Sequence, residues 1–260
     1  MVYAKQRHKV LVHYVGKYLG AKRILGTNLQ KAGLTLQRVV WSRRATSWDE
    51  MSNPGLDRVV GEVLRLVGDR PDANALDLGC GSGQLSIPLA SQVKSVVALD
   101  IAPKMIELLR SKLETGGITN VTAAVGSVQQ YGIVNGSVDL VCSNYVLHHL
   151  SDNEKLRFVK DCFEWLVPGG ELIFGDMMFG RGSTADDRAV IADKVKILMK
   201  KGIGGYWRIA KNGVRYLFRF QEKPISLAAW VDMLKKVGFV EINTQRVIAE
   251  AGVICAKKPQ

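Results

Sequence analysis

The chain has 260 residues, of which 47% are hydrophobic, and its formal net charge is +12. This length and hydrophobic content suffice for one well-packed domain with elaborations. No apolar run approaches the ~20 residues of a membrane span, and the first residues lack a signal-peptide core, so we expect an intracellular, cytoplasmic protein. The four cysteines are scattered without a Cys-x-x-Cys pair, which argues against a disulfide framework and against a metal site.

The positive charge is concentrated in two segments. Residues 1–45 contain ten Lys and Arg and no acidic residue, and residues 177–225 contain eleven basic residues against four acidic ones. The rest of the chain carries more acidic than basic residues. We therefore expect anionic partners to contact the two basic segments.

Residues 1–52 form the first predicted unit, a basic helical arm. Between residues 9 and 19, apolar side chains recur at helical spacing and basic side chains occupy another face. Such a helix packs on the adjoining domain, contacts an anionic membrane, contacts nucleic acid or serves in organelle targeting. Composition leaves these alternatives open, so the arm is a candidate for peripheral membrane or RNA contact.

Residues 53–260 form the second predicted unit. Asn53-Pro54 supplies an N-cap and a first-turn proline, and apolar residues from Leu56 to Val67 form one stripe, which predicts a helix covering a sheet. Ala75 to Ala90 then reads as a strand, a tight glycine turn and a helix. Such a turn binds a ligand through its backbone, because glycine permits close approach and a helix N-terminus leaves N–H groups free.

The chemistry around this turn favours a ligand with a cationic group and no phosphate. The glycines of the turn are Gly79, Gly81 and Gly83. Their Gly-x-Gly-x-Gly spacing differs from the Gly-x-Gly-x-x-Gly of dinucleotide sites, and Asp77, two residues earlier, would repel a pyrophosphate. The next strand, Ser95 to Leu99, ends in Asp100, whose carboxylate can accept both hydroxyls of a ribose.

Strands and helices continue to alternate along the chain. We expect a helix from Pro103 to about Leu113, strands at Val121–Val125 and Val138–Ser143, a helix at Asp152–Leu166 and, after a turn at Pro168-Gly169-Gly170, a strand at Glu171–Asp176. The last elements are a helix from about Ser226 to Val237 and strands at Phe239–Val247 and Val253–Lys257. This alternation predicts a parallel sheet whose ligands bind beyond the carboxyl ends of the strands.

These segments resemble the successive motifs of class I S-adenosyl-L-methionine-dependent methyltransferases of the type 11-like group. The resemblance rests on Asp77 to Gly83, Asp100, Asp139 to Leu150 and Leu166 to Gly170, and it covers roughly Asn53 to Lys258. It implies a Rossmann-like α/β fold with a seven-stranded, mostly parallel sheet, helices on both faces and an antiparallel C-terminal hairpin. It also implies S-adenosyl-L-methionine as the cofactor.

The resemblance places a set of residues around this cofactor. The turn and the second strand contribute Asp77, Gly79, Cys80, Gly81, Gly83, Asp100 and Ile101. Where the family usually has an acidic residue for adenine, Ser127 offers a hydroxyl and Val128 a backbone N–H. Asn144 and Tyr145 are expected to form a wall shared by cofactor and substrate. Their sequence departs from the Asn/Asp-Pro-Pro-Tyr/Phe of enzymes that methylate exocyclic amines of bases or glutamine.

Residues 177–225 exceed an ordinary connection, so we predict a lid that closes on the acceptor. Asp186 to Lys201 reads as a helix, whereas residues 206–220 suit either a hairpin or a helix. Either form brings Trp207, Arg215 and Tyr216 to one region. The aromatic side chains either build the lid's own small core, with the arginine solvated, or form a pocket for an anionic or aromatic acceptor.

Two adjacent histidines are the candidate catalytic residues. A base is needed only if the acceptor must lose a proton, and His148 or His149 can take one near pH 7 as a neutral imidazole. The alternative is that this His-His pair, which is frequent at this turn in the family, has no acid–base role.

We expect in-line transfer of a methyl group to a small-molecule or lipid-like acceptor, because the chain has a large lid and no separate nucleic-acid-binding domain. RNA methylation is the first alternative, favoured by the basic arm. A non-catalytic cofactor-binding scaffold is a second, and a nicotinamide-dependent oxidoreductase, which rests only on the glycines, is a third.

Overall fold

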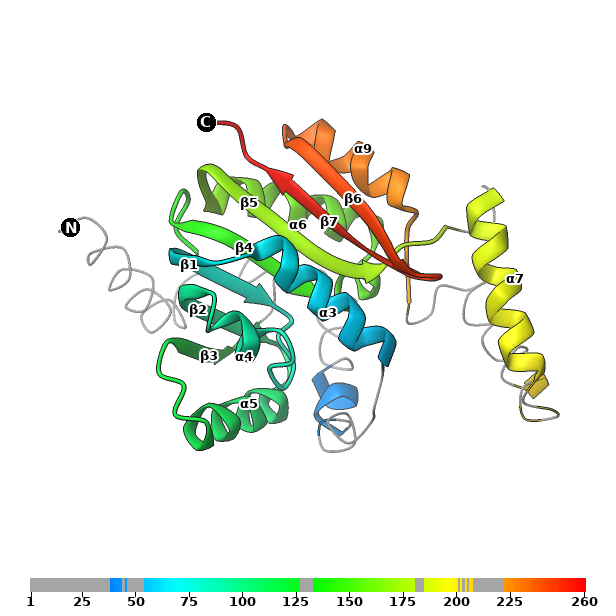
Figure 1. The fold of residues 1–260 in the computed structure, drawn as a ribbon, viewed down its shortest axis with the longest axis horizontal. Helices are drawn as coiled ribbons and strands as arrows, with labels where there is room; N and C mark the ends of the chain where they lie inside the picture. Colours follow the sequence, from blue (N-terminus) through cyan, green and yellow to red (C-terminus); the bar gives the residue numbers. More distant parts are fainter. Residues whose placement is uncertain are drawn as a thin grey trace.

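A central sheet organises the chain (Figure 1). The computed structural model describes residues 38–43, 45, 54–126, 133–180, 185–200, 202, 204, 206, 207 and 222–260. The strands of the sheet are β1 (Arg70–Leu78), β2 (Val93–Asp100), β3 (Val121–Val125), β4 (Val138–Asn144), β5 (Leu166–Met177), β6 (Val240–Ile248) and β7 (Ala251–Lys257). They lie in the order β3-β2-β1-β4-β5-β7-β6.

The sheet is parallel except at one edge. β1 to β5 run parallel to their neighbours, while β7 is antiparallel to both β5 and β6. The expected seven-stranded Rossmann-like sheet with its antiparallel C-terminal hairpin is therefore confirmed. Its strand order changes direction between β1 and β4, and this is where open parallel sheets bind their ligands.

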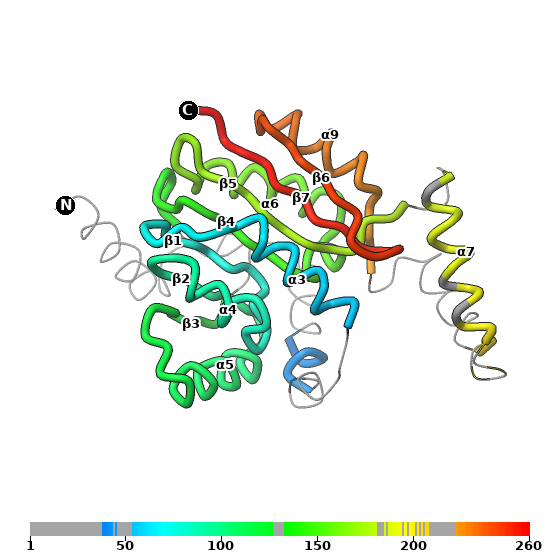
Figure 2. The backbone as a smooth tube through the Cα atoms, in the orientation of Figure 1, coloured from blue at the N-terminus to red at the C-terminus, as the bar shows by residue number. Residues whose placement is uncertain are grey.

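Helices cover both faces of the sheet (Figure 2). The described part of the chain contains α3 (Pro54–Val67), α4 (Ser86–Leu89), α5 (Pro103–Thr115), the short 3₁₀ helix η2 (Leu147–His149), α6 (Asp152–Trp165), α7 (Ala185–Met199) and α9 (Leu227–Val237). α3 contacts β5, β6 and β7, and α5 contacts β2 and β3. α6 contacts β5, α9 contacts β6, and these two helices also contact each other. α7 lies at the periphery, away from the sheet (Figure 1).

Alternation along β1 sends side chains into two separate cores. Ala75 packs among the residues of α3 and α5, whereas Leu76 and Leu78 pack among the residues of α6 and α9. Burial of one such leucine contributes roughly 1.5–3 kcal/mol, so the two cores hold the strands firmly. The carboxyl ends of the strands are thereby fixed as a platform for a site.

Two elements differ from the expectation. The helix that follows the glycine turn, α4, is a single turn that ends at Leu89. β5 begins at Leu166 instead of Glu171, and its pairing with β4 changes register between Val138 and Leu140. The Pro-Gly-Gly sequence thus makes an irregularity inside the strand, where Gly169 adopts a φ of 75°.

A capping box starts α6 directly after η2. Ser151 is the N-cap, its hydroxyl oxygen accepts from the Glu154 N–H, and its own N–H donates to Glu154 at 2.8 Å. Such a cap stabilises a helix by about 1 kcal/mol. It fixes the end of the turn that carries the two histidines.

In the described part of the chain, no helix has the length and apolar character to cross a membrane. Nor do three or more His, Cys, Asp or Glu side chains gather there as metal ligands.

Candidate functional site

A pocket lies where the carboxyl ends of β1, β2 and β4 meet the glycine turn and η2. Seven residues expected around a cofactor line it: Asp77, Gly79, Cys80, Gly81, Asp100, Ile101 and Asn144. Tyr145 and His149 also line it, and so do apolar side chains of Leu56, Leu85, Leu99, Met105, Val146 and Leu150. Polar groups at one side and an apolar surround suit a small ligand with a charged end.

Glycine is required at the three positions of the turn for different physical reasons. A Cβ at Gly79 would overlap the side chain of Val146, and one at Gly83 would overlap Leu109, whereas one at Gly81 would meet no atom within 4 Å. All three have positive φ, of 74°, 53° and 95° for Gly79, Gly81 and Gly83. Gly79 and Gly83 are thus needed for close packing, while Gly81 adopts its left-handed conformation beside open space in the pocket.

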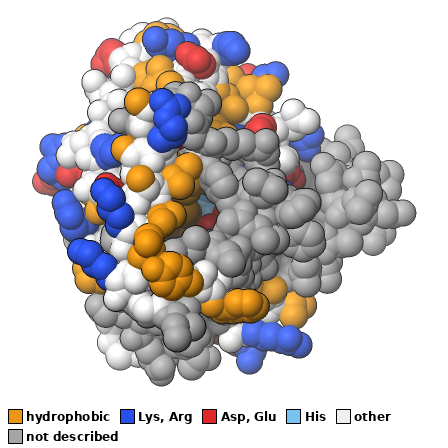
Figure 3. Space-filling model, turned by 90° about the vertical axis from the view of Figure 1, so that its right-hand side faces the viewer, with side chains coloured by type: hydrophobic (Ala, Val, Ile, Leu, Met, Phe, Trp, Pro, Cys, Tyr) orange, Lys and Arg blue, Asp and Glu red, His pale blue; other side chains and the backbone are white. Residues whose placement is uncertain are grey.

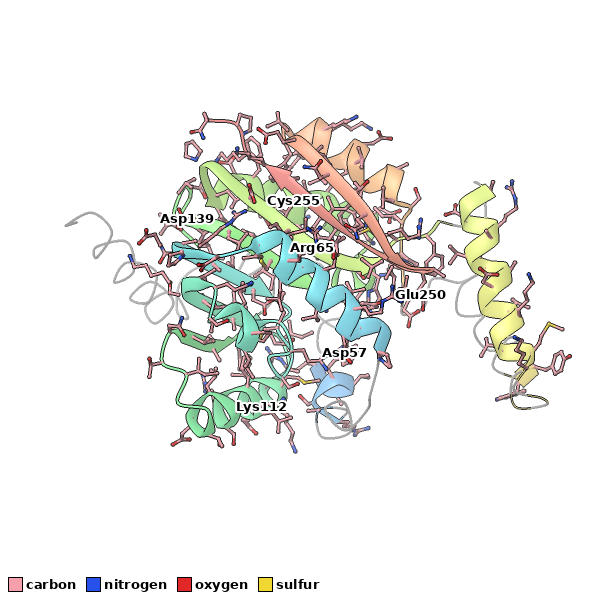
Figure 4. All side chains as sticks on the ribbon, in the orientation of Figure 1. Asp57, Arg65, Lys112, Asp139, Glu250 and Cys255 are labelled. Carbon is pink, nitrogen blue, oxygen red and sulfur yellow. The ribbon has the colours of Figure 1, made fainter. Side chains whose placement is uncertain are left out.

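Hydrogen bonds hold the turn in place. The N–H groups of Gly79 and Cys80 both donate to the carbonyl of Leu99, at 2.7 and 3.0 Å. Lys112, labelled in Figure 4, reaches from α5 to donate to the carbonyl of Ser82 at 3.1 Å. The turn is therefore a rigid cradle formed before any ligand arrives.

Asp77 presents a buried carboxylate to the pocket. Its side chain is 1% exposed, and Oδ2 accepts a hydrogen bond of 2.5 Å from the Ser86 hydroxyl. Oδ1 is also buried and has no hydrogen-bond partner among the described residues. Burial raises the pKa of Asp77 to about 7, the Ser86 hydrogen bond opposes this rise, and the charge of Asp100 adds to it.

Asn144 provides a second such oxygen. Asn144 lines the pocket, and its Oδ1 is buried beside Gly175, where no described residue donates a hydrogen bond to it. The next residue, Tyr145, has a φ of 55° and donates its N–H to Gly175 at 2.9 Å, so the chain turns sharply as β4 ends. Buried acceptor oxygens without donors suit a ligand group that donates several hydrogen bonds, such as an ammonium.

Asp100 is fixed by the backbone around it. Its two oxygens accept from the Gly81 N–H at 3.0 Å and the Ala102 N–H at 2.8 Å. Burial raises the pKa of this carboxyl, and these backbone hydrogen bonds lower it. Since a carboxylate has about four acceptor positions, room remains for two hydroxyl groups.

The two histidines have different surroundings. His149 lines the pocket, and its ring meets the Trp41 ring edge-on at 5.5 Å. His148 is not part of the pocket lining; its Nδ1 lies 2.5 Å from Oδ1 of Asp176, at the end of β5. The rings of the two histidines are 4.1 Å apart.

The described lining of this pocket does not include all of the expected residues. Ser127, Val128, Arg215, Tyr216 and the arm up to residue 37 lie outside the described residues, so their roles stay predictions. Trp207 is described: its side chain is 73% exposed and does not line the pocket. Gly83 supports the turn from behind without lining the pocket.

The structure adds residues that the motifs did not single out. Trp41, which precedes the domain, lines the pocket. Ser86 has no motif of its own, because its role arises only when α4 folds back against β1. The pairing of Asp176 with His148 joins residues 28 positions apart and depends on the contact between β4 and β5.

Comparisons with known proteins agree on one family. A family model described as a methyltransferase domain matches residues 75–170. The ubiquinone biosynthesis O-methyltransferase of Xanthomonas euvesicatoria pv. vesicatoria is 32% identical over 182 residues, which are 69% of this chain and 67% of that protein. Phosphoethanolamine N-methyltransferase 1 of Arabidopsis thaliana is 29% identical over 150 residues, or 57% of this chain but 29% of that protein.

A solved structure has the same fold. It is phosphoethanolamine N-methyltransferase 2 of Haemonchus contortus, in complex with phosphomonomethylethanolamine and S-adenosylhomocysteine. The similarity has a TM-score of 0.61 at 17% identity and covers 80% of this chain and 54% of that one.

Proposed function

The chain belongs to the class I S-adenosyl-L-methionine-dependent methyltransferases, and we propose that it methylates a small-molecule or lipid-like acceptor that carries negative charge. It is an enzyme that uses S-adenosyl-L-methionine. We assign the cofactor site from two buried oxygens, Oδ1 of Asp77 and Oδ1 of Asn144, which have no hydrogen-bond partner among the described residues.

The pocket's chemistry fits this cofactor. In our proposal the ammonium of its methionine part donates to Oδ1 of Asp77 and Oδ1 of Asn144, where a cation offsets the cost of burying both acceptors. The ribose hydroxyls donate to Asp100. Gly81 lies beside open space, so backbone and ligand can approach closely there. Ser127 and Val128 are proposed to bind the adenine.

The chemistry at the acceptor follows from position. The bound cofactor supplies a methyl group that its sulfonium already activates. The apolar side chains around the pocket exclude water, and Asn144, Tyr145 and η2 set the direction of approach. We propose His148 and His149 as the candidate groups that take a proton from the acceptor.

Two findings support the choice of acceptor. Relatives named for a phosphorylated amine and for ubiquinone biosynthesis are methyltransferases of small or lipid-like molecules by their names. The segment 177–225, proposed as a lid with Tyr145, Trp207, Arg215 and Tyr216 at the acceptor, carries an excess of basic residues. An acidic acceptor is attracted to such a segment.

Figure 3 shows the face at the end of the molecule where α7 lies. Hydrophobic side chains form a band there, with Lys and Arg side chains beside it. A surface of this kind suits an acceptor with an apolar part and an anionic part. RNA methylation remains the second candidate, favoured by the ten basic residues of residues 1–45.

Calorimetric titration tests the cofactor site first. S-adenosylhomocysteine is titrated into the wild type, Asp100→Ala and Asp139→Asn. Asp139 is the matched control, because it also accepts a backbone N–H but lies near the start of β4, at the end of the strand away from the pocket (Figure 4). We expect micromolar binding by the wild type and the control and none by Asp100→Ala; equal binding by all three would refute the site.

A radiolabelled transfer assay then tests the acceptor. The probes are phosphoethanolamine, a catechol with a short prenyl chain, vesicles of anionic lipid and total RNA. Methyl transfer to one of the first three supports the proposal. Transfer to RNA alone, falling steeply as salt is raised, would move the assignment to the RNA alternative.

A further inference from the structure

The side chain of Asp176 holds His148 at two points. Oδ1 lies 2.5 Å from the ring Nδ1, and Oδ2 accepts the His148 backbone N–H at 2.8 Å. Oδ1 also accepts the N–H of Met177 at 2.6 Å. Asp176 is completely buried, so the carboxylate and the ring form one fixed unit.

These contacts decide the form of the imidazole. Because N–H groups already donate to both oxygens of Asp176, the carboxylate acts as an acceptor and Nδ1 is the donor of the pair. A neutral histidine with a proton on Nδ1 has its free lone pair on Nε2. The carboxylate also stabilises the imidazolium that forms when Nε2 takes a proton.

The ring lies one side chain away from the cofactor pocket. Two aromatic rings of described residues contact it, those of Tyr145 at 6.2 Å and His149 at 4.1 Å, and both residues line the pocket. The His148 side chain is 7% exposed.

Residues at or beside both ends of the segment 177–225 contact this histidine. Asp176 directly precedes that segment, and the N–H of Lys223, close to its end, donates to the His148 carbonyl at 2.5 Å. The carbonyl of Lys223 in turn accepts from Lys155 at 2.6 Å. An acceptor bound between the pocket and the two ends of this segment therefore meets His148.

We propose that His148 is the group that takes the acceptor's proton, with Asp176 as its positioning residue, and that the acceptor atom is a hydroxyl oxygen or an amine nitrogen. This inference rests on the proposed methyl transfer and assigns its proton acceptor. As the O–H or N–H bond breaks, its proton goes to Nε2 of His148. The acceptor's electron pair forms the bond to the methyl carbon, and the electron pair of the broken sulfur–carbon bond stays on sulfur.

A nuclear magnetic resonance experiment tests the inference without a known acceptor. The wild type, Asp176→Asn and the control Asp139→Asn are labelled with ¹⁵N-histidine, with His148→Asn to assign the resonances. We expect His148 to be protonated on Nδ1 in the wild type and in the control, and to change its tautomer in Asp176→Asn. A proton on Nε2 of the neutral wild-type ring would overturn the proposal.

Several charged or titratable groups face His148 from the elements packed around it. Asp176 faces it from β5, His149 adjoins it in η2, and Tyr145 faces it from the end of β4. Glu250, at the turn between β6 and β7, acts on Tyr145 by its charge. The comparison with Asp139→Asn keeps all four in place.

Turnover gives a second readout, with catechol and 4-nitrocatechol as probes. His148→Asn is the informative variant, because the asparagine amide can still donate to Asp176 but lacks Nε2. We expect its kcat with catechol to fall about 100-fold or more, with a smaller fall for 4-nitrocatechol, which ionises more readily. S-adenosylhomocysteine affinity should stay within about twofold.

The outcomes distinguish a failure of the proposed function from a failure of the role of His148. A wild type that does not bind S-adenosylhomocysteine contradicts the proposed function. A His148→Asn variant that keeps the wild-type kcat, or loses catechol and 4-nitrocatechol turnover equally, contradicts only the role of His148. If the wild type turns over neither probe, the tautomer of His148 decides the inference.

Discussion

The hydroxyl of Ser86 donates a 2.5 Å hydrogen bond to Oδ2 of Asp77, a pocket-lining residue, and leaves Oδ1 of this buried carboxylate without a partner among the described residues. The serine stands nine residues after the aspartate, on the single turn of α4. One oxygen is thus restrained by the protein while the other remains for a ligand. The Ser86 hydrogen bond fixes the orientation of the Asp77 carboxylate and lowers the free-energy cost of burying its negative charge.

Replacing Ser86 by alanine should weaken cofactor binding. The change removes the hydrogen bond that opposes the raised pKa of Asp77, so less of the carboxylate is ionised near neutral pH. We expect S-adenosylhomocysteine to bind roughly tenfold more weakly at pH 7 by calorimetry, the usual scale for a hydrogen bond to a charged group. Ser91→Ala, which removes an exposed hydroxyl just after α4, should leave the affinity unchanged.

Asp77 should make the stability of the ligand-free protein fall as pH rises. Burial raises the pKa of Asp77 in the folded state to about 7, from an ordinary value of 3.8. Between about pH 4 and pH 7 the folded state therefore keeps a proton that the unfolded state has lost, and ionisation favours unfolding. Relative to Asp77→Asn, the free energy of unfolding should fall by on the order of 2–4 kcal/mol over this range, as measured by urea denaturation.

The same group should make cofactor binding depend on pH in the opposite direction. An ammonium binds best to the ionised carboxylate, so S-adenosylhomocysteine affinity should rise about fivefold or more from pH 6 to pH 7.5. Asp77→Asn should bind weakly at both pH values. A wild-type affinity that is flat across this interval, measured by calorimetry, would show that Asp77 does not contact the ammonium.

Gly79→Ala should disrupt the pocket through Val146. The new Cβ would overlap the Val146 side chain, and alanine disfavours the φ of 74° at this position. We expect at least a tenfold loss of S-adenosylhomocysteine affinity by calorimetry and a lower melting temperature. Adding Val146→Ala should restore part of the stability, since it removes most of the overlap but not the backbone strain.

Gly61→Ala is the matched control for this prediction. Gly61 lies inside α3, and a Cβ there would meet no atom within 4 Å. Alanine should leave the affinity unchanged and raise stability by up to about 1 kcal/mol, because glycine is a poor helix former. Equal effects of the two substitutions would rule out a specific role for close packing at Gly79.

Local sequence predicted the parts of the site that local geometry determines. The strand, the glycine turn and Asp100 follow from the spacing of a few residues, and so the cofactor end of the pocket could be read before the structure. The Asp176–His148 pair could not, because it depends on which residues of β4 and β5 lie side by side: Asn144 pairs with Gly175. Contacts of this kind are decided by packing, which no short motif encodes.

Lys155 shows the same limit inside a helix. Helical periodicity identifies α6, but it assigns a lysine to the solvated face, whereas Lys155 is completely buried. Its ammonium lies against the carbonyls of two segments that the sequence does not connect.

Replacing this buried lysine by methionine should loosen the acceptor side of the site. The Lys155 ammonium donates to the carbonyls of Leu150 at 2.5 Å and Lys223 at 2.6 Å, and so it ties residues after β5 to the histidine turn. Lys155→Met leaves both carbonyls without this donor, which should cost about 2–4 kcal/mol of folding free energy. Hydrogen exchange of the Lys223 amide, which donates to His148, should become faster.

Lys160→Met, on an exposed position of the same helix, separates this effect from a general loss of charge. It should change neither the free energy of unfolding by more than about 0.5 kcal/mol nor the exchange of the Lys223 amide. If both variants behave alike, Lys155 contributes only to helix packing. If only Lys155→Met accelerates exchange at Lys223 while S-adenosylhomocysteine still binds, the lysine fastens the segment that flanks the acceptor, independently of the cofactor end of the pocket.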